Sequence, residues 1–166
     1  MRLAGGRPGR RLDGAVTPDP PFPRAVVPCP FCGRVNAVDL SRIDDRPRCG
    51  ECGRPILLDR PVKLSDADFD RVIERSGVPV LVDFYADWCG PCRVMAPTID
   101  ELAADRAGRA LVGKLDTDRN PATANRFEIR GIPTTIVFRE GHEAGRRTGA
   151  IGRTELDALL DDSTGG

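Results

Sequence analysis

Two cysteines stand where an apolar strand gives way to a helix. Residues 78–85 are mostly apolar and predict a buried strand, and residues 93–102 predict a helix. Cys89 and Cys92 lie between them in the motif Trp-Cys-Gly-Pro-Cys. The unpaired N–H groups and the dipole at a helix N-terminus stabilise a thiolate, which lowers its pKa from about 8.5 toward about 7. Cys89 is therefore the expected nucleophile. Cys92 lies one turn further on and can close a disulfide with it; a structural disulfide or half of a metal site is the alternative.

Asp83 is the one acidic residue inside the apolar strand. Burial disfavours a charged carboxylate, so we expect its pKa to be raised. It lies six residues before Cys89, which should place it beneath the C-x-x-C turn. A buried acid that titrates near neutrality can take the proton of Cys92 and return it. The alternative is a hydrogen-bonded structural carboxylate.

Four further cysteines form two more C-x-x-C pairs, each followed by glycine. Sixteen residues separate the two pairs. This spacing predicts one tetrahedral Zn²⁺ site with four thiolate ligands, which leaves no open position for a substrate and is therefore structural. Redox disulfides or free thiols are the alternative. The four expected metal ligands are Cys29, Cys32, Cys49 and Cys52.

Composition and charge limit the classes of function and the compartments that fit this chain. The chain has 166 residues and a formal net charge of zero, which gives no general attraction to nucleic acid or membranes. No apolar run approaches the roughly 20 residues that a membrane span needs, and no secretory signal is recognisable. Six cysteines in three C-x-x-C pairs then favour metal or redox chemistry in a reducing, cytoplasmic compartment. We expect a monomer.

The chain divides into three parts. Residues 1–24 are rich in Arg, Pro and Gly and predict a disordered extension. Residues 25–58 predict a small zinc-binding domain whose few apolar side chains make it dependent on the metal. Residues 61–162 alternate between strand and helix patterns and predict an α/β domain. Within that domain, Ser65 and Thr154 are expected to cap helices.

The strand, the Trp-Cys-Gly-Pro-Cys motif and the helix together resemble the thioredoxin family, over about residues 61–161. The four-cysteine segment makes the chain similar to zinc-containing members of that family. The resemblance implies a thioredoxin fold, in which a central mixed sheet is flanked by helices, preceded by a small Cys₄ zinc-ribbon-like domain. It implies that Asp83 is the proton acceptor, that Lys114 faces and tunes it, and that the peptide bond before Pro133 is cis.

The resemblance also implies a substrate-binding surface around Cys89. Trp88 would be a partly exposed aromatic platform, and the backbone of Ile132 would bond an extended substrate segment. The expected surface comprises Trp88, Gly90, Pro91, Ile132, Pro133, Gly149 and Ala150.

The expected function is reduction of protein disulfides, after which an NADPH-dependent thioredoxin reductase would reduce the Cys89–Cys92 pair again. The expected partners are disulfide-containing proteins and that reductase. Gly90-Pro91 between the cysteines is the pair found in reducing members of the family, so an oxidant or isomerase is a weaker interpretation. A different class of function is also open: a zinc-ribbon adapter, or a chaperone switched when oxidant expels the zinc.

Overall fold

The computed structural model describes residues 23–163. The expected extension 1–24 therefore lies outside the described residues, apart from Pro23 and Arg24, the second of which already belongs to a strand. The strands are β1 (Arg24–Pro28), β2 (Val35–Asp39), β3 (Val62–Leu64), β4 (Val80–Tyr85), β5 (Leu111–Asp116), β6 (Thr134–Arg139) and β7 (His142–Thr148). The helices are a 3₁₀ helix η1 (Leu40–Asp45) and the α-helices α1 (Phe69–Arg75), α2 (Gly90–Arg106), α3 (Pro121–Arg126) and α4 (Arg153–Asp162).

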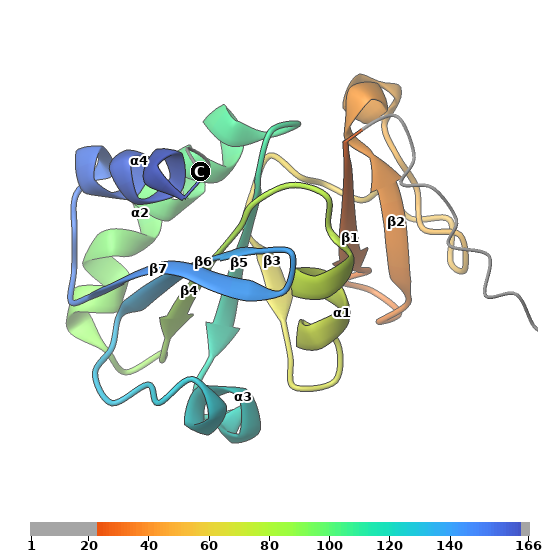
Figure 1. The fold of residues 1–166 in the computed structure, drawn as a ribbon. Coiled ribbons are helices and arrows are strands. Elements are labelled where there is room, and N and C mark those ends of the chain that lie inside the picture. Colours follow the sequence, from red (N-terminus) through yellow and green to blue (C-terminus); the bar gives the residue numbers. More distant parts are fainter. Residues whose placement is uncertain (1–22, 164–166) are drawn as a thin grey trace, which may run out of the picture.

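Five strands form one mixed sheet in the order β3-β5-β4-β6-β7. β3, β5 and β4 are parallel, while β6 and β7 run antiparallel to their neighbours. Helices α2 and α4 lie on one face of the sheet, and α1 and α3 lie on the other (Figure 1). This is the predicted thioredoxin fold, with β4 as the central strand.

Alternation along β4 divides its side chains between two cores. Val80, Val82 and Phe84 pack with the buried residues of α1. Leu81 packs with α2 and α4 on the opposite face. Asp83 follows the same alternation and is therefore directed to the α2 face, where Cys89 and Cys92 lie at the start of the helix.

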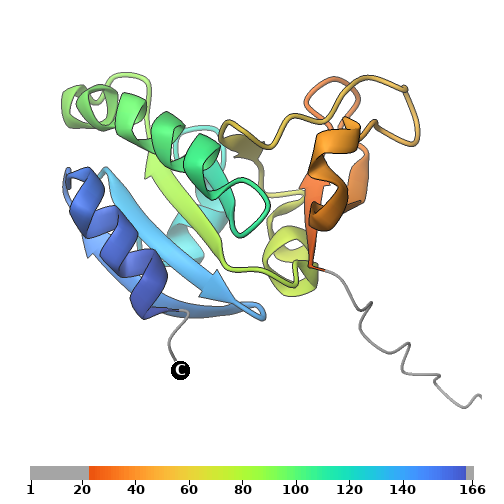
Figure 2. The ribbon, with the colours of Figure 1, turned by 90° about the horizontal axis from the view of Figure 1, so that it is seen from above.

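The N-terminal unit shares its core with the larger domain. β1 and β2 form an antiparallel hairpin that stands beside α1, on the opposite side of the molecule from β7 (Figures 1 and 2). Val27, Cys29, Cys49 and Leu58 belong to the same buried cluster as residues of α1 and β4. The sequence predicted a unit that depends on the metal for its stability, and did not reveal this apolar packing against the larger domain.

Two hydrogen bonds fix the hairpin to the end of α1. The Val26 N–H donates to the Ser76 hydroxyl at 3.0 Å, and the Gly77 N–H donates to the Arg24 carbonyl at 2.9 Å. Ser76 is itself buried, so its hydroxyl is satisfied within this contact. The N-terminal unit and α1 are thus joined by hydrogen bonds as well as by apolar packing.

Both predicted helix caps were wrong. α1 begins at Phe69 after Asp68, whose carboxylate accepts from the N–H and hydroxyl of Ser65, because these residues form a turn rather than a helix start. α4 begins one residue before Thr154, with Gly152 at the cap position. No helix in the described part of the chain has the length and apolarity to cross a membrane.

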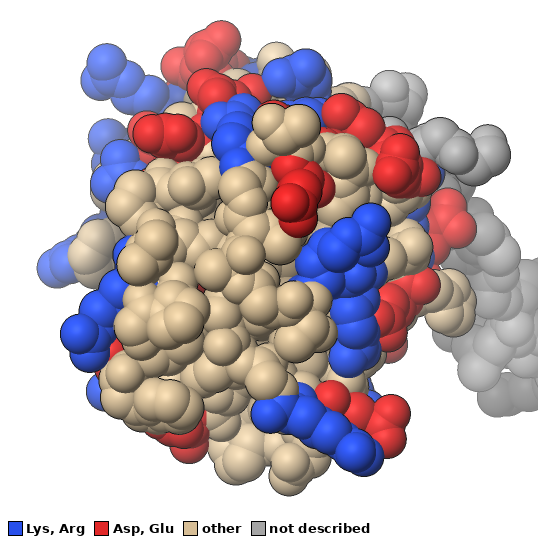
Figure 3. Space-filling model, turned by 90° about the vertical axis from the view of Figure 1, so that its left-hand side faces the viewer, with Lys and Arg blue, Asp and Glu red and all other residues tan. Residues whose placement is uncertain are grey.

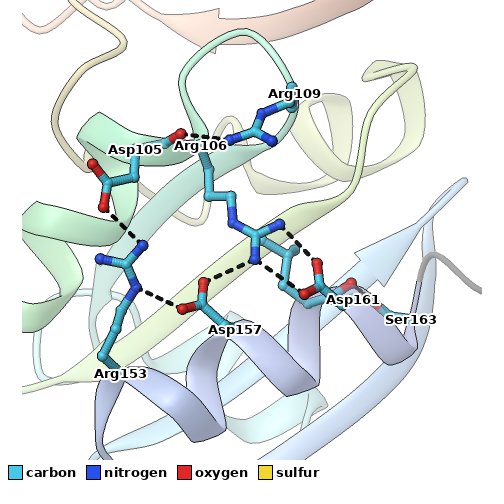
Figure 4. Close-up of polar contacts among 8 residues, drawn as sticks. Asp105, Arg106, Arg109, Arg153, Asp157, Asp161 and Ser163 are labelled. Atoms are coloured by element: carbon cyan, nitrogen blue, oxygen red, sulfur yellow. Dashed lines mark hydrogen bonds and ion pairs between the residues drawn. The ribbon is translucent and has the colours of Figure 1, made fainter.

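An ion-pair network joins α2 to α4 (Figure 4). Arg106 on α2 donates to Asp157 at 2.8 Å and to Asp161 at 2.7 Å, and its side chain is only 18% exposed. Arg153 on α4 reaches back to Asp105 at 2.8 Å. The helix that carries the cysteines is therefore anchored at its far end.

Candidate functional site

Cys89 and Cys92 are joined by a disulfide at the start of α2. Cys89 occupies the cap position, where its Sγ accepts from the Cys92 N–H at 3.2 Å. Both side chains are almost fully buried and pack with Ala86, Tyr85 and Ile132. When the bond is reduced, the same N–H and the helix dipole would favour a thiolate on Cys89.

The loop that leads into β6 meets Cys89. The peptide bond between Ile132 and Pro133 is cis, as expected. The Ile132 carbonyl oxygen lies 3.7 Å from the Cys89 Sγ, so a reduced thiol there has an acceptor within reach. Two segments 43 residues apart in the chain thus meet at the sulfur.

Asp83 lines a cavity of about 190 Å³ that also reaches Cys92 and Lys114. Asp83 is 3% exposed, and its Oδ1 has no hydrogen-bond partner among the described residues. Burial raises the pKa of Asp83 to about 7, while the positive charge of Lys114 acts in the opposite direction. Asp83, Cys92 and Lys114 are therefore brought together as the sequence predicted.

Lys114 is placed by strand register. It lies opposite Asp83 on the parallel strand β5, and its ammonium group stands over the Tyr85 ring, 4.5 Å from the centroid. The aromatic face attracts the cation and limits where it can swing. Lys114 is half-buried rather than a freely exposed surface lysine.

Few charged side chains lie on the face around the cysteines. Figure 3 shows the end of the molecule where α2 begins, with uncharged residues gathered in the middle and charged residues around them. Trp88 is 67% exposed and Val94 is 76% exposed there. Large exposed apolar side chains on an uncharged face are candidates for contact with a protein partner.

The structure adds two residues that the sequence did not indicate. The Trp88 indole N–H donates to the Asp118 carboxylate at 2.8 Å, which fixes the ring orientation. Arg93 donates twice to the Asp87 carbonyl, at 3.0 and 2.7 Å, and holds the loop before Cys89 against α2. Asp118 is 30 residues from Trp88, and no local pattern signals the pair.

The remaining expected surface residues differ in exposure. Gly90 and Pro91 are exposed in the first turn of α2, and Pro91 needs no N–H there. Pro133 is buried and Ile132 half-buried. Gly149 has φ of 95°, which only glycine adopts without strain, and its N–H donates to the Pro133 carbonyl at 2.8 Å. Ala150 beside it is exposed.

The other four cysteines converge in the N-terminal unit. The Sγ atoms of Cys29, Cys32, Cys49 and Cys52 all lie within 4.8 Å of one another. The Cys29–Cys52 and Cys32–Cys49 distances are 3.7 and 3.6 Å. Four thiolates at about 2.3 Å from one zinc stand about 3.8 Å apart in a tetrahedron. The donor set and its spacing therefore fit a Cys₄ zinc site.

The backbone of the two knuckles suits this site. Gly33 and Gly53 have φ of 77° and 73°, as expected for the residue after each pair. The Glu51 N–H and the Asn36 amide donate toward Cys49 Sγ at 3.4 and 3.6 Å. N–H donors directed at sulfur offset the negative charge of a four-thiolate site.

Comparison with known proteins identifies both units. The family described as Thioredoxin matches residues 60–162, and the family described as Thioredoxin 2, N-terminal, a zinc ribbon, matches residues 28–54. The curated Thioredoxin C-3 of Corynebacterium nephridii is 35% identical, over 82% of this chain and 93% of that protein. Thioredoxin of Staphylococcus aureus (strain Mu50 / ATCC 700699) is 50% identical, over 60% of this chain and 94% of that protein.

A solved structure agrees. A single-site mutant of thioredoxin from Halobacterium salinarum NRC-1 superposes with a TM-score of 0.59 and 34% identity, covering 66% of this chain and 95% of that one. The chain therefore belongs to the thioredoxin family. Its N-terminal match gives it, within that family, the zinc-ribbon arrangement of thioredoxin 2. It is a thiol-disulfide oxidoreductase with a redox-active Cys89–Cys92 disulfide and a four-cysteine zinc site.

Proposed function

We propose that Cys89 is the attacking thiol, Cys92 the resolving thiol and Asp83 the proton acceptor in reduction of protein disulfides. The Cys89 thiolate attacks one sulfur of the substrate disulfide; a mixed disulfide forms and the first substrate sulfur leaves. The Cys92 thiol passes its proton to the Asp83 carboxylate and attacks Cys89 Sγ. The Cys89–Cys92 bond forms, the second substrate sulfur leaves, and Asp83 returns the proton to it.

The observation that carries this assignment is the position of each sulfur relative to Trp88 and Asp83. Cys89 caps the helix beside the exposed Trp88, whereas Cys92 faces the cavity that holds Asp83. A substrate sulfur can therefore approach Cys89, while Asp83, the buried carboxyl of that cavity, lies beside the second sulfur. A carboxyl whose pKa lies near 7 exchanges protons with a thiol at neutral pH.

Single-cysteine variants test the division of roles. Cys92→Ser should accumulate a mixed disulfide with insulin or with a small model disulfide, because attack proceeds and resolution cannot. Cys89→Ser should neither turn over insulin disulfides nor trap them. Trapping by Cys89→Ser and not by Cys92→Ser would reverse the assignment.

The substrate surface is proposed to be the uncharged face around Cys89. Trp88, Gly90, Pro91, Ile132, Pro133, Gly149 and Ala150 are the residues proposed to contact an extended segment of the substrate. The Ile132 carbonyl is placed to accept a backbone N–H of that segment, a one-residue strand addition.

Partners and compartment follow from the chemistry. Each turnover oxidises the dithiol, so a reductant must restore it; we propose an NADPH-dependent thioredoxin reductase, as the family implies. Four thiols held close together without a disulfide favour a reducing compartment such as the cytoplasm. Reduction of the Cys89–Cys92 bond by purified reductase and NADPH, followed by the loss of NADPH absorbance, tests the first point.

We propose that the zinc is structural and that the units divide at about residues 58–61. Cys29 and Cys49 lie within the shared core, which supports this role over that of a separate adapter or a redox-switched chaperone. Deleting residues 1–60 would strip that core, so a cleaner test is a metal and thiol count on the reduced, intact protein. One zinc with two freely titrating thiols supports the proposal; six free thiols without metal contradict it.

A further inference from the structure

Two buried oxygen atoms of the described side chains have no hydrogen-bond partner, and they belong to neighbouring residues. They are Oδ1 of Asp83 and the hydroxyl oxygen of Thr135. The two residues are register partners on the antiparallel strands β4 and β6. Buried polar atoms rarely stay unpaired, so two such atoms on adjacent strands call for a joint explanation.

The side chains lie on the same face of the sheet. Leu81 on β4 and its register partner Val137 on β6 both pack against α2 and α4. Asp83 lies two positions after Leu81, and Thr135 lies two positions before Val137. Because side chains alternate along a strand, both point to that same face. Opposed residues on antiparallel strands have Cβ atoms about 4.5–5.5 Å apart, which is within reach of a hydroxyl–carboxyl hydrogen bond after side-chain rotation.

Thr135 is completely buried, and a hydroxyl at this place has no packing advantage over valine. Its neighbour Thr134, by contrast, donates to the Gly131 carbonyl at 2.6 Å. The Thr135 hydroxyl can act as donor to one oxygen of Asp83 while Lys114 attracts the carboxylate from β5, on the other side of β4. The row Thr135–Asp83–Lys114 thus crosses three adjacent strands.

We propose that Thr135 is a positioning residue for the redox reaction: its hydroxyl donates a hydrogen bond to the Asp83 carboxylate and holds it ready for the proton of Cys92. This rests on the proposed role of Asp83. A donor favours the charged form of a carboxyl and so acts with Lys114 against the effect of burial. The other titratable or charged groups lining the cavity are Cys92 and Arg93 from α2 and Tyr85 and Asp87 from the end of β4 and its loop.

The direct test is titration of the Asp83 carboxyl carbon by NMR in the oxidised protein, where Cys89 and Cys92 do not titrate. Thr135→Val keeps the shape and removes the donor. It should shift the Asp83 midpoint about one pH unit upward, a tenfold change in proton affinity that corresponds to about 1.4 kcal/mol. Thr135→Ser keeps the hydroxyl and should restore the wild-type midpoint.

The functional readout is the pH dependence of mixed-disulfide resolution. The rise in rate with pH should move upward by the same amount in Thr135→Val and return in Thr135→Ser. In an Asp83→Asn background, Thr135→Val should change the rate profile no further. Should Thr135→Val fail to fold, as judged by circular dichroism, Thr135→Ala takes its place.

An unchanged or lowered Asp83 midpoint in Thr135→Val would overturn the proposal, as would a serine variant that behaves like valine. Failure of the proposed function looks different: Asp83→Asn would then resolve mixed disulfides at the wild-type rate, whatever the titration of Thr135→Val shows.

Discussion

Asp83 and Lys114 lie side by side on the two central parallel strands, with the acid buried and the base half-buried over the Tyr85 ring. Burial raises the pKa of the carboxyl to about 7, and the lysine limits that rise without cancelling it. The acid therefore titrates where the enzyme is proposed to work, and its burial affects stability as well as rate.

The first prediction concerns stability against pH. The folded protein holds the Asp83 proton more tightly than the unfolded chain, whose aspartates titrate near about 3.9. The contribution of the protonated carboxyl to the free energy of unfolding is therefore fully present below about pH 4, and it is lost as pH rises through about 7. Asp83→Asn should match the wild type near about pH 4 and exceed it at about pH 8, by on the order of 4 kcal/mol in the free energy of unfolding. Urea unfolding of the oxidised proteins at both pH values measures this; equal differences at the two pH values would refute it.

A second prediction concerns Lys114. Lys114→Met keeps a long side chain and removes the charge, so the pKa of Asp83 should rise further and its carboxylate should become scarcer at neutral pH. Resolution of mixed disulfides at neutral pH should slow several-fold and recover at more alkaline pH. Lys63, exposed on β3, gives a matched control as Lys63→Met. A loss of rate that is the same at every pH would point to damaged packing instead.

The third prediction concerns the Trp88 ring. Asp118→Ala removes the acceptor of the indole N–H, and the exposed ring should then sample other orientations. A lost hydrogen bond of about 1 kcal/mol corresponds to about a fivefold fall in kcat/KM for insulin, expressed mainly in KM. Asp118→Asn retains an acceptor oxygen and should stay near the wild type. If alanine and asparagine have the same effect, charge rather than the hydrogen bond is responsible.

Metal removal gives a fourth prediction. Cys29 and Cys49 belong to the core shared with α1, so loss of zinc should lower the melting temperature of the thioredoxin fold by at least about 5 °C. Trp88 is the only tryptophan, and its fluorescence reports on the larger domain alone. Chelation should therefore shift the fluorescence melt, and added Zn²⁺ should restore it. A fluorescence melt that chelation leaves unchanged would show that the two units are energetically independent.

The fifth prediction concerns the α2–α4 ion pairs. Arg106 is mostly buried and holds two carboxylates, so Arg106→Ala should lower the free energy of unfolding by about 1–3 kcal/mol. Arg42 forms an exposed pair with Asp45, and Arg42→Ala should change it by less than about 0.5 kcal/mol. Thermal or urea unfolding compares them. Equal effects would mean that burial of the network adds nothing.

The sequence predicted the reactive and metal-binding residues of the site better than the residues that hold them in place. Cys89, Cys92 and the four zinc ligands are visible because their spacing is itself the signal. Asp83 stood out because a charged residue interrupts an apolar strand. The fold followed from the alternation of strand and helix patterns between residues 62 and 160, with element ends wrong by a few residues where turns compete with helix caps.

The parts that escaped prediction depend on distant contacts. Thr135 reads as an ordinary β-branched strand residue, and Asp118 as an ordinary turn acid. The strand β1 was missed because its apolar residues, Ala25 to Val27, follow an Arg- and Pro-rich stretch and are too few to show a period. The roles of these residues depend on neighbours that are distant in the sequence.

The hydrogen bonds that tie β1 to Ser76 and Gly77 have a consequence for protein engineering. A designer who wished to transplant the metal-binding hairpin onto another thioredoxin would need to carry the end of α1 with it. If the hairpin were moved alone, its apolar side would be exposed to solvent. The Val26 N–H and the Arg24 carbonyl would also lose their hydrogen-bond partners. The transferable unit is therefore larger than the cysteine motifs suggest.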